Sequence, residues 1–169
     1  MTIIFIIVLI VLCFLAIYIY QSKTNQTSNI KELYAEGLDM LVSGKRQSAY
    51  KNFKDIVDKD SNNIKAYIRL GQVLREGGNE LKAIKIHKNL LFRKNINSYE
   101  LIELHKNLSL DYFKINSLEE SINECKKILK IDNNNEWAIH QLVVLYRDNN
   151  QWDEATEYLK MYFEKTGKK

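Results

Sequence analysis

The sequence predicts an all-α protein in which about four helical hairpins form a curved stack behind one N-terminal transmembrane helix. Three observations support this. Similar segments recur at a regular spacing, the 169 residues contain no proline and only 6 glycines, and residues 3–20 are apolar and uncharged. Because proline and glycine interrupt helices, their scarcity favours long helices. A regular repeat of a few tens of residues is typical of stacked helical hairpins.

The apolar run reads IIFIIVLIVLCFLAIYIY. As a helix with a rise of ~1.5 Å per residue it is about 27 Å long, close to the ~30 Å hydrocarbon core of a bilayer. We therefore expect a membrane anchor over residues 1–21. Tyr20 lies at its end, and one helical face consists of Ile3, Ile7, Ile10, Phe14 and Tyr18. This face has no small residues for close helix pairing, so a plain tether without a partner stays open.

A cleaved secretory signal is the alternative to an anchor. Such a signal needs a basic segment before the apolar run and a small-residue cleavage site after it, and neither is present. Lys23 and Lys31 follow the run, whereas no Lys or Arg precedes it. Because basic residues favour the cytoplasmic side, we expect residues 21–169 to lie in the cytoplasm.

Composition argues against several functions. The 25 Lys and Arg interleave with 21 Asp and Glu and form no basic block, so nucleic acid is not an expected partner. Cys13 and Cys125 are too few for a disulfide framework or a four-cysteine metal site, so no cofactor or metal is expected. Residues 22–29, SKTNQTSN, are short and polar and indicate a linker.

A small residue marks each repeat in the remainder of the chain. It is Ala49, Ala83, Ser121 and Ala155, at spacings of 34, 38 and 34 residues. In three units a Leu-Gly-like pair comes before it: Leu70-Gly71, Leu108-Ser109 and Leu142-Val143. This is the tetratricopeptide pattern W-x2-L-G-x2-Y…A-x3-F…P without its proline, and each unit of that pattern is one helical hairpin.

We therefore expect a tetratricopeptide domain over residues 30–169. Its repeats fall at about 30–63, 64–97, 102–135 and 136–169, with helix pairs near 31–43/46–58, 64–76/80–92, 99–114/118–130 and 136–148/152–165. The longer spacing predicts an insert at 93–98, and Asn-rich turns replace the proline. The last helix carries Leu159, Tyr162 and Phe163, an apolar face through which an oligomer is possible.

No catalytic constellation is present, so we do not expect an enzyme. His87, His105 and His140 have no Cys, Ser or carboxylate at a nucleophile or metal spacing. His87 occupies an apolar helix position, where a hydrogen-bonded packing role is far commoner than ligation. Cys125, at the equivalent position of the next unit, is expected to be a buried thiol, and Trp152 is expected to pack.

The concave face of the stack is the expected binding site. The first helix of each pair lines that face, and basic side chains around apolar ones suit an acidic, partly apolar peptide. Counting along three of these helices selects Lys65, Gln72, Arg75, Lys106, Leu110, Phe113, Trp137, His140 and Arg147. The alternative is that they are ordinary solvated helix residues.

The stretch 70–91, LGQVLREGGNELKAIKIHKNLL, together with the apolar run, resembles the lipopolysaccharide assembly protein B family. The matching positions are Tyr34, Gly37, Leu41, Ala66, Leu70-Gly71, Arg75, Gly78, Ala83-Ile84, Ile86-His87, the 93–98 insert and Asp111-Tyr112. In that family, a C-terminal rubredoxin-like metal domain with two cysteine pairs follows the repeats. This sequence has no C-x-x-C, so the metal function is not implied, and both a shortened relative and an N-terminal part stay open.

The resemblance implies a non-enzymatic adapter in a bacterial inner membrane, with a single pass, that regulates lipopolysaccharide (lipid A) synthesis. In the family the anchor contacts a membrane AAA+ protease and promotes degradation of the deacetylase that commits carbon to lipid A. By resemblance, residues 3–20 would contact the protease and the groove would hold clients or lipopolysaccharide-synthesis enzymes. A scaffold for another envelope assembly process is the first alternative. A redox or metal enzyme subunit is the second, and the lack of paired cysteines argues against it.

Overall fold

The structure is a computed structural model that describes the backbone of residues 2–167 and the side chains of residues 9–21, 24 and 27–167. All regular structure in the described backbone is helical, which confirms the predicted all-α class. The helices are α1 (Thr2–Val42), α2 (Arg46–Lys59), α3 (Ile64–Glu76), α4 (Glu80–Leu90), α5 (Ser98–Lys114), α6 (Leu118–Ile131), α7 (Glu136–Asp148) and α8 (Trp152–Thr166).

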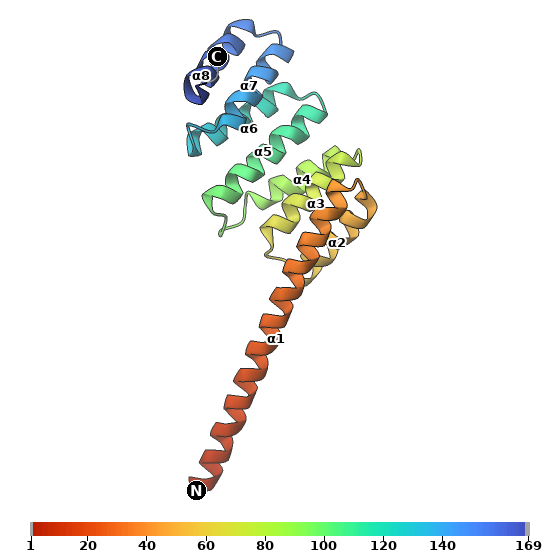
Figure 1. Cartoon of the computed structure of the whole chain (residues 1–169), viewed down its shortest axis with the longest axis vertical. Helices are drawn as coiled ribbons and strands as arrows, with labels where there is room; N and C mark the ends of the chain where they lie inside the picture. Colours follow the sequence, from red (N-terminus) through yellow and green to blue (C-terminus); the bar gives the residue numbers. More distant parts are fainter. Residues whose placement is uncertain (1, 168–169) are drawn as a thin grey trace.

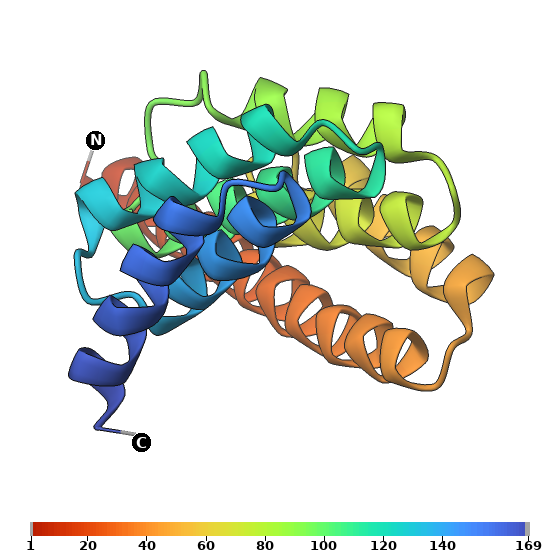
Figure 2. The ribbon, with the colours of Figure 1, turned by 90° about the horizontal axis from the view of Figure 1, so that it is seen from above.

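The helices form hairpins that stack in chain order, each hairpin packing on the next (Figure 1). Seen from above, the helix direction turns between α1 and α8, so the stack is twisted (Figure 2). From α2 to α8 the predicted helix boundaries agree with the observed ones to within 2 residues. The insert at 93–98 forms most of the connection between α4 and α5. The division of the chain into domains stays a prediction.

One predicted break is wrong, because α1 continues through residues 22–29, where the polar composition indicated a linker. The segment contains no Gly or Pro, and Ser, Thr and Asn each cost a helix only roughly 0.5 kcal/mol relative to Ala. Thr24 also donates its hydroxyl to the Tyr20 carbonyl at 2.9 Å, a bond that forms within a helix. The first helix of the repeats is therefore the C-terminal part of a 41-residue helix.

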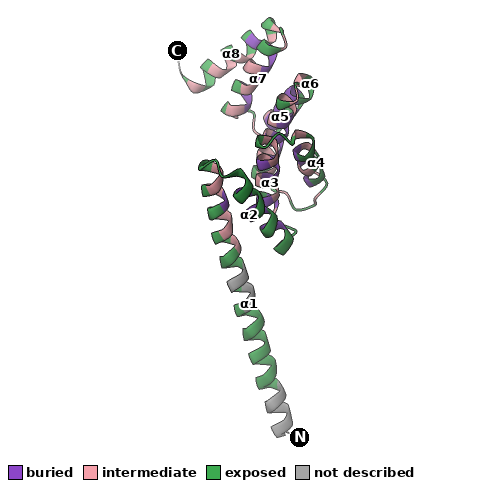
Figure 3. Ribbon diagram, turned by 90° about the vertical axis from the view of Figure 1, so that its right-hand side faces the viewer, coloured by how far each residue is buried: buried purple, intermediate pink, exposed green. Residues whose placement is uncertain are grey.

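The N-terminal part of α1 projects away from the stack (Figure 3). Ile10, Phe14, Tyr18 and Tyr20 are all exposed, Tyr20 at 74%. Ile3 and Ile7, the other two residues of the predicted anchor face, lie outside the described side chains. Among the residues that the structure describes, no helix has both the length and the apolar character needed to cross a membrane.

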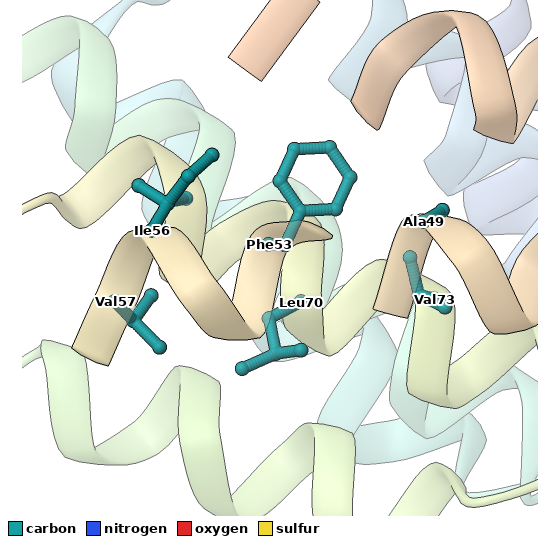
Figure 4. Close-up of a cluster of buried hydrophobic side chains, with 7 residues drawn as sticks. Ala49, Phe53, Ile56, Val57, Leu70 and Val73 are labelled. Carbon is teal, nitrogen blue, oxygen red and sulfur yellow. The ribbon is translucent and has the colours of Figure 1, made fainter. Parts of the chain in front are cut away.

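The core lies between successive helices and repeats from unit to unit. The first cluster joins Phe53 and Ile56 of α2 to Leu70 and Val73 of α3 (Figure 4). Tyr34 of α1 closes it with its ring edge toward Phe53, at a centroid separation of 5.6 Å. Similar clusters join α3, α4 and α5, and then α6, α7 and α8. Each hairpin therefore covers the apolar face of its neighbour, as stacked repeats require.

In the first three units a small residue on the first helix lets a larger one approach from the second helix. A Cβ added at Gly37 would lie 2.8 Å from Cζ of Phe53, and one at Gly71 would lie 2.3 Å from Nε2 of His87. In the third unit Ser109 takes this place and its hydroxyl lies 3.1 Å from the Cys125 thiol. The Leu-Gly-like position of the repeat is thus explained by the close approach of two helices.

Trp152 does not pack as predicted. It is the first residue of α8 and 60% of it is exposed. The repeat pattern does not show which side of the first turn of a helix faces outward.

Candidate peptide-binding face

The odd-numbered helices form one continuous face, which we call the A-helix face. Arg69 of α3 donates from Nε to the Tyr34 hydroxyl of α1 at 3.3 Å. The Arg69 guanidinium also lies 3.8 Å from the Glu103 carboxylate of α5, and Lys106 lies 3.6 Å from the same carboxylate. The Lys106 ammonium is 5.0 Å from the ring centroid of Trp137 on α7. A chain of side chains therefore joins α1, α3, α5 and α7.

The first pocket on this face lies where α1, α3 and α5 meet and has a volume of about 190 Å³. Lys65 and Arg69 bring positive charge and N–H donors to it, and Tyr34 and Tyr99 bring aromatic rings. The full lining is Tyr34, Lys65, Ile68, Arg69, Tyr99, Glu100 and Glu103. Lys65 forms no ion pair with any residue whose side chain is described, so its ammonium is available to a ligand carboxylate.

A second pocket, of about 280 Å³, lies between α7 and α8 and is lined by Glu136, Trp137, His140 and Tyr162. The structure thus brings together Trp137 and His140, which the sequence selected, with Tyr162, which it did not select because Tyr162 is on the second helix of its pair. The rings of His140 and Tyr162 have their centroids 5.6 Å apart at an angle of 59°.

Arg75, another groove candidate, is paired within the fold, and its role in binding stays a prediction. Its side chain is 11% exposed and donates from Nη1 to Oδ1 of Asp111 at 2.7 Å. The same nitrogen lies 3.2 Å from Oδ1 of Asn107. A guanidinium next to a buried carboxylate pairs with it rather than with solvent, since an unpaired buried carboxylate is costly. Sequence counting does not detect such a partner on the next helix.

The remaining candidates also have partners in the fold. Gln72 accepts a hydrogen bond from Arg69 at 2.8 Å and donates one to Glu76 at 2.9 Å. Phe113 packs against the last core cluster, and Leu110 is half-buried. Arg147 is exposed and pairs with its neighbour Asp148 at 2.9 Å. As binding residues, these candidates stay predictions.

Internal pairing changes the electrostatics expected of the A-helix face. Arg69 and Lys106 share Glu103, and Arg75 is held by Asp111, so much of the positive charge counted from the sequence is compensated. Charged side chains that form no ion pair within the described residues line both pockets. They are Lys65 and Glu100 at the first pocket, beside the Arg69–Glu103 pair, and Glu136 at the second.

His87 has the hydrogen-bonded packing role that was predicted. It is fully buried, Nδ1 lies 2.5 Å from Oδ2 of Asp111, and Nε2 lies 3.1 Å from the Ile68 carbonyl. Cys125 is buried as predicted, and burial raises the pKa of its thiol to about 12. Among the described residues, no group of three or more His, Cys, Asp or Glu is placed to hold a metal ion.

His105 and Glu124 form a further buried pair, 2.6 Å apart between Nδ1 and Oε2. Burial by itself raises the pKa of Glu124, but hydrogen bonds from His105 and Lys127 outweigh it and hold the pKa below its ordinary value. The pair joins α5 to α6 within the third unit, as the Ser109 hydroxyl does by its bond to Ser121.

Comparison with solved structures defines the fold. MamA from Desulfovibrio magneticus RS-1 matches with a TM-score of 0.69 and 19% identity, over 81% of this chain and 75% of that one. A tetratricopeptide repeat protein from Parabacteroides merdae matches with a TM-score of 0.68 and 20% identity, over 83% and 54%. YrrB, a tetratricopeptide protein with an unusual peptide-binding site, matches with a TM-score of 0.62 and 15% identity, over 82% and 70%. The chain therefore has the tetratricopeptide-repeat fold.

Among curated proteins the chain is similar to lipopolysaccharide assembly protein B of Escherichia coli K12. The two are 21% identical over 137 residues, which is 81% of this chain and 35% of that protein. The chain thus spans about a third of the length of the curated relatives it matches. No family model matches the sequence.

Proposed function

We propose that this protein is a membrane-attached scaffold that holds a segment of a partner protein on its A-helix face. The observation that supports it most is the continuity of α1, which carries both the exposed apolar residues up to Tyr20 and the first-pocket residue Tyr34. Fourteen helical residues separate these two positions, or about 21 Å at ~1.5 Å each. An apolar segment inserted in a bilayer would hold the face close to the membrane surface.

The role we propose resembles that of lipopolysaccharide assembly protein B. The scaffold lies in a bacterial inner membrane with the repeats in the cytoplasm, and it brings lipid A enzymes or other clients to a membrane protease or assembly complex. Support comes from the 21% identity over 137 residues and from Lys23 and Lys31 after the apolar run, since basic residues favour the cytoplasmic side.

Membrane attachment is tested by replacing two exposed apolar residues of α1. Arginine is costly at the centre of a membrane helix, by roughly 2.5–3.5 kcal/mol on insertion scales. We expect Leu12→Arg with Leu15→Arg to release the full chain from the membrane fraction under alkaline extraction. Leu81→Arg is the matched control, because Leu81 is equally apolar and 74% exposed but lies on α4. Equal retention of both variants would reject the anchor.

Partner binding is tested by reversing charge in the first pocket. The full-length protein carrying Lys65→Glu should lose a cross-linked partner that the unchanged protein captures, because Lys65 is the free cation of that pocket. Lys88→Glu on α4 makes the same charge change at an exposed residue outside the pocket. Recovery of a membrane AAA+ protease or lipid A enzymes would support the specific role. Recovery of another set of envelope proteins would support a general envelope scaffold instead.

A further inference from the structure

The second pocket has the composition of a site for a cation. It is lined by the aromatic residues Trp137, His140 and Tyr162 and by the acidic residue Glu136. Aromatic faces attract an ammonium or guanidinium through the ring quadrupole, and a carboxylate adds a direct charge interaction. The sequence had suggested an acidic ligand along this face, which these groups do not favour.

Two of the aromatic walls are held in position by the fold. Trp137 packs with part of its surface against the last core cluster. Tyr162 lies against His140 on one side, and its ring centroid is 6.1 Å from that of Phe163. A ligand that enters the pocket therefore meets rings that are already arranged, which lowers the cost of ordering them on binding.

The charge at the pocket has no internal partner. Glu136 occupies the first turn of α7, where Asn135 caps the helix by accepting a hydrogen bond from the Ala138 amide. Its carboxylate forms no ion pair or hydrogen bond with the described part of the chain. Nearby, the Lys106 ammonium lies 5.0 Å from the Trp137 ring centroid and shares the Glu103 carboxylate with Arg69. The protein thus already places one cation against this indole.

We propose that the pocket of Glu136, Trp137, His140 and Tyr162 binds the cationic side chain, arginine or lysine, of a partner peptide. The inference rests on the proposed function, because the peptide lies on the A-helix face. It also makes that function more specific. A peptide that places an acidic group at Lys65 and a basic side chain at Glu136 pairs opposite charges at both positions.

The test measures binding of an acetylated Gly-Arg-Gly amide to the full-length protein in detergent. The chain has 2 tryptophans, so Trp152→Phe leaves Trp137 as the only indole, and its fluorescence reports on the pocket. The comparison peptide contains citrulline, which has nearly the shape of arginine and no charge. We expect a saturable change with the arginine peptide and binding at least roughly threefold weaker with citrulline, from the loss of the cation–π and ionic contacts.

Two variants assign the effect to the pocket. Glu136→Gln keeps the side-chain size, removes the charge and should reduce the preference for arginine over citrulline, and Tyr162→Leu should weaken the arginine peptide. Glu157→Gln on α8 is the matched control at an exposed residue outside the pocket, and it should leave binding unchanged. Equal binding of the two peptides, no saturable change, or an unaltered preference in Glu136→Gln would overturn the proposal. Capture of partners through Lys65 is measured separately, so a protein that captures partners without preferring arginine rejects only this inference.

Discussion

His87 and Asp111, both fully buried, join α4 to α5 through a hydrogen bond of 2.5 Å. The Asp111 carboxyl group and the Ile68 carbonyl face the two ring nitrogens of His87. Asp111 also accepts from Arg75 of α3, so one buried carboxylate holds three helices of two successive units together.

Loss of that carboxylate should weaken the whole stack. Asp111→Ala leaves Arg75 and His87 without their partner, and breaking a buried pair typically costs ~3–5 kcal/mol. We expect a decrease of this size in the free energy of unfolding, measured by urea denaturation with circular dichroism. Asp148→Ala removes the carboxylate of a pair whose arginine is 55% exposed and should cost no more than about 1 kcal/mol. Similar effects of both variants would contradict a structural role for the Asp111 network.

The space between α3 and α4 permits no side chain at Gly71. An added Cβ would lie 2.3 Å from Nε2 of His87, a ring that Asp111 and the Ile68 carbonyl hold in place. Gly71→Ala should therefore destabilise the protein by ~1–3 kcal/mol, the usual cost of overpacking. In Gly77→Ala the nearest atom is the Val73 carbonyl oxygen at 3.3 Å, so the same denaturation experiment should show little loss. A neutral or stabilising Gly71→Ala would be inconsistent with this packing.

Acid should remove the contribution of Glu124 to stability. The pKa of this carboxyl is lower in the folded protein than its ordinary value, so its contribution is present above that ordinary value and is lost as pH falls through the folded pKa. We expect the difference in unfolding free energy between the unchanged protein and Glu124→Gln to be large at neutral pH and to shrink in acid. The exposed control Glu157→Gln should show no such trend. A pH-independent difference for Glu124→Gln would argue against the interaction with His105 and Lys127.

Cys125 should be unreactive while the protein is folded. Its thiol is buried and has a pKa raised to about 12, and only the thiolate is a good nucleophile. In a Cys13→Ser background we expect no reaction with a water-soluble thiol reagent at mildly alkaline pH until denaturant unfolds the protein. Fast labelling in buffer would show that the α5–α6 packing opens readily.

The repeats could be predicted from the sequence because each unit must bring two helices close together. The small residues of the repeat are all buried, and their regular spacing can be read directly from the sequence. They are Ala49, Ala83, Ser121 and Ala155. The break at 22–29 was wrong because polar residues were taken as helix breakers, whereas only Gly and Pro interrupt a helix strongly.

The candidate site was predictable in its location but not in its electrostatics. Counting along first helices selected Trp137 and His140, which share a pocket, and Lys65, which lines another; that they bind a partner stays a prediction. Counting along the helices could not predict that Arg75 and Arg69 form ion pairs within the protein. Their carboxylate partners, Asp111 and Glu103, come from the next unit, and repeat position does not show which charges meet across units. Tyr162 was missed because it belongs to a second helix.

Because α1 is uninterrupted, it also fixes the rotation of the pockets about the helix axis relative to the apolar N-terminal part. In a helix each added residue turns everything beyond it by about 100° and moves it by about 1.5 Å along the axis. With its apolar end seated in a bilayer, a single alanine inserted after Gln21 would swing the pockets a quarter-turn or more around the helix axis. Four inserted residues would return them to nearly the original bearing, only about 6 Å farther out. Binding of a partner fixed in the same bilayer would then depend on the rotation that the inserted residues produce, and not on the added distance from the membrane.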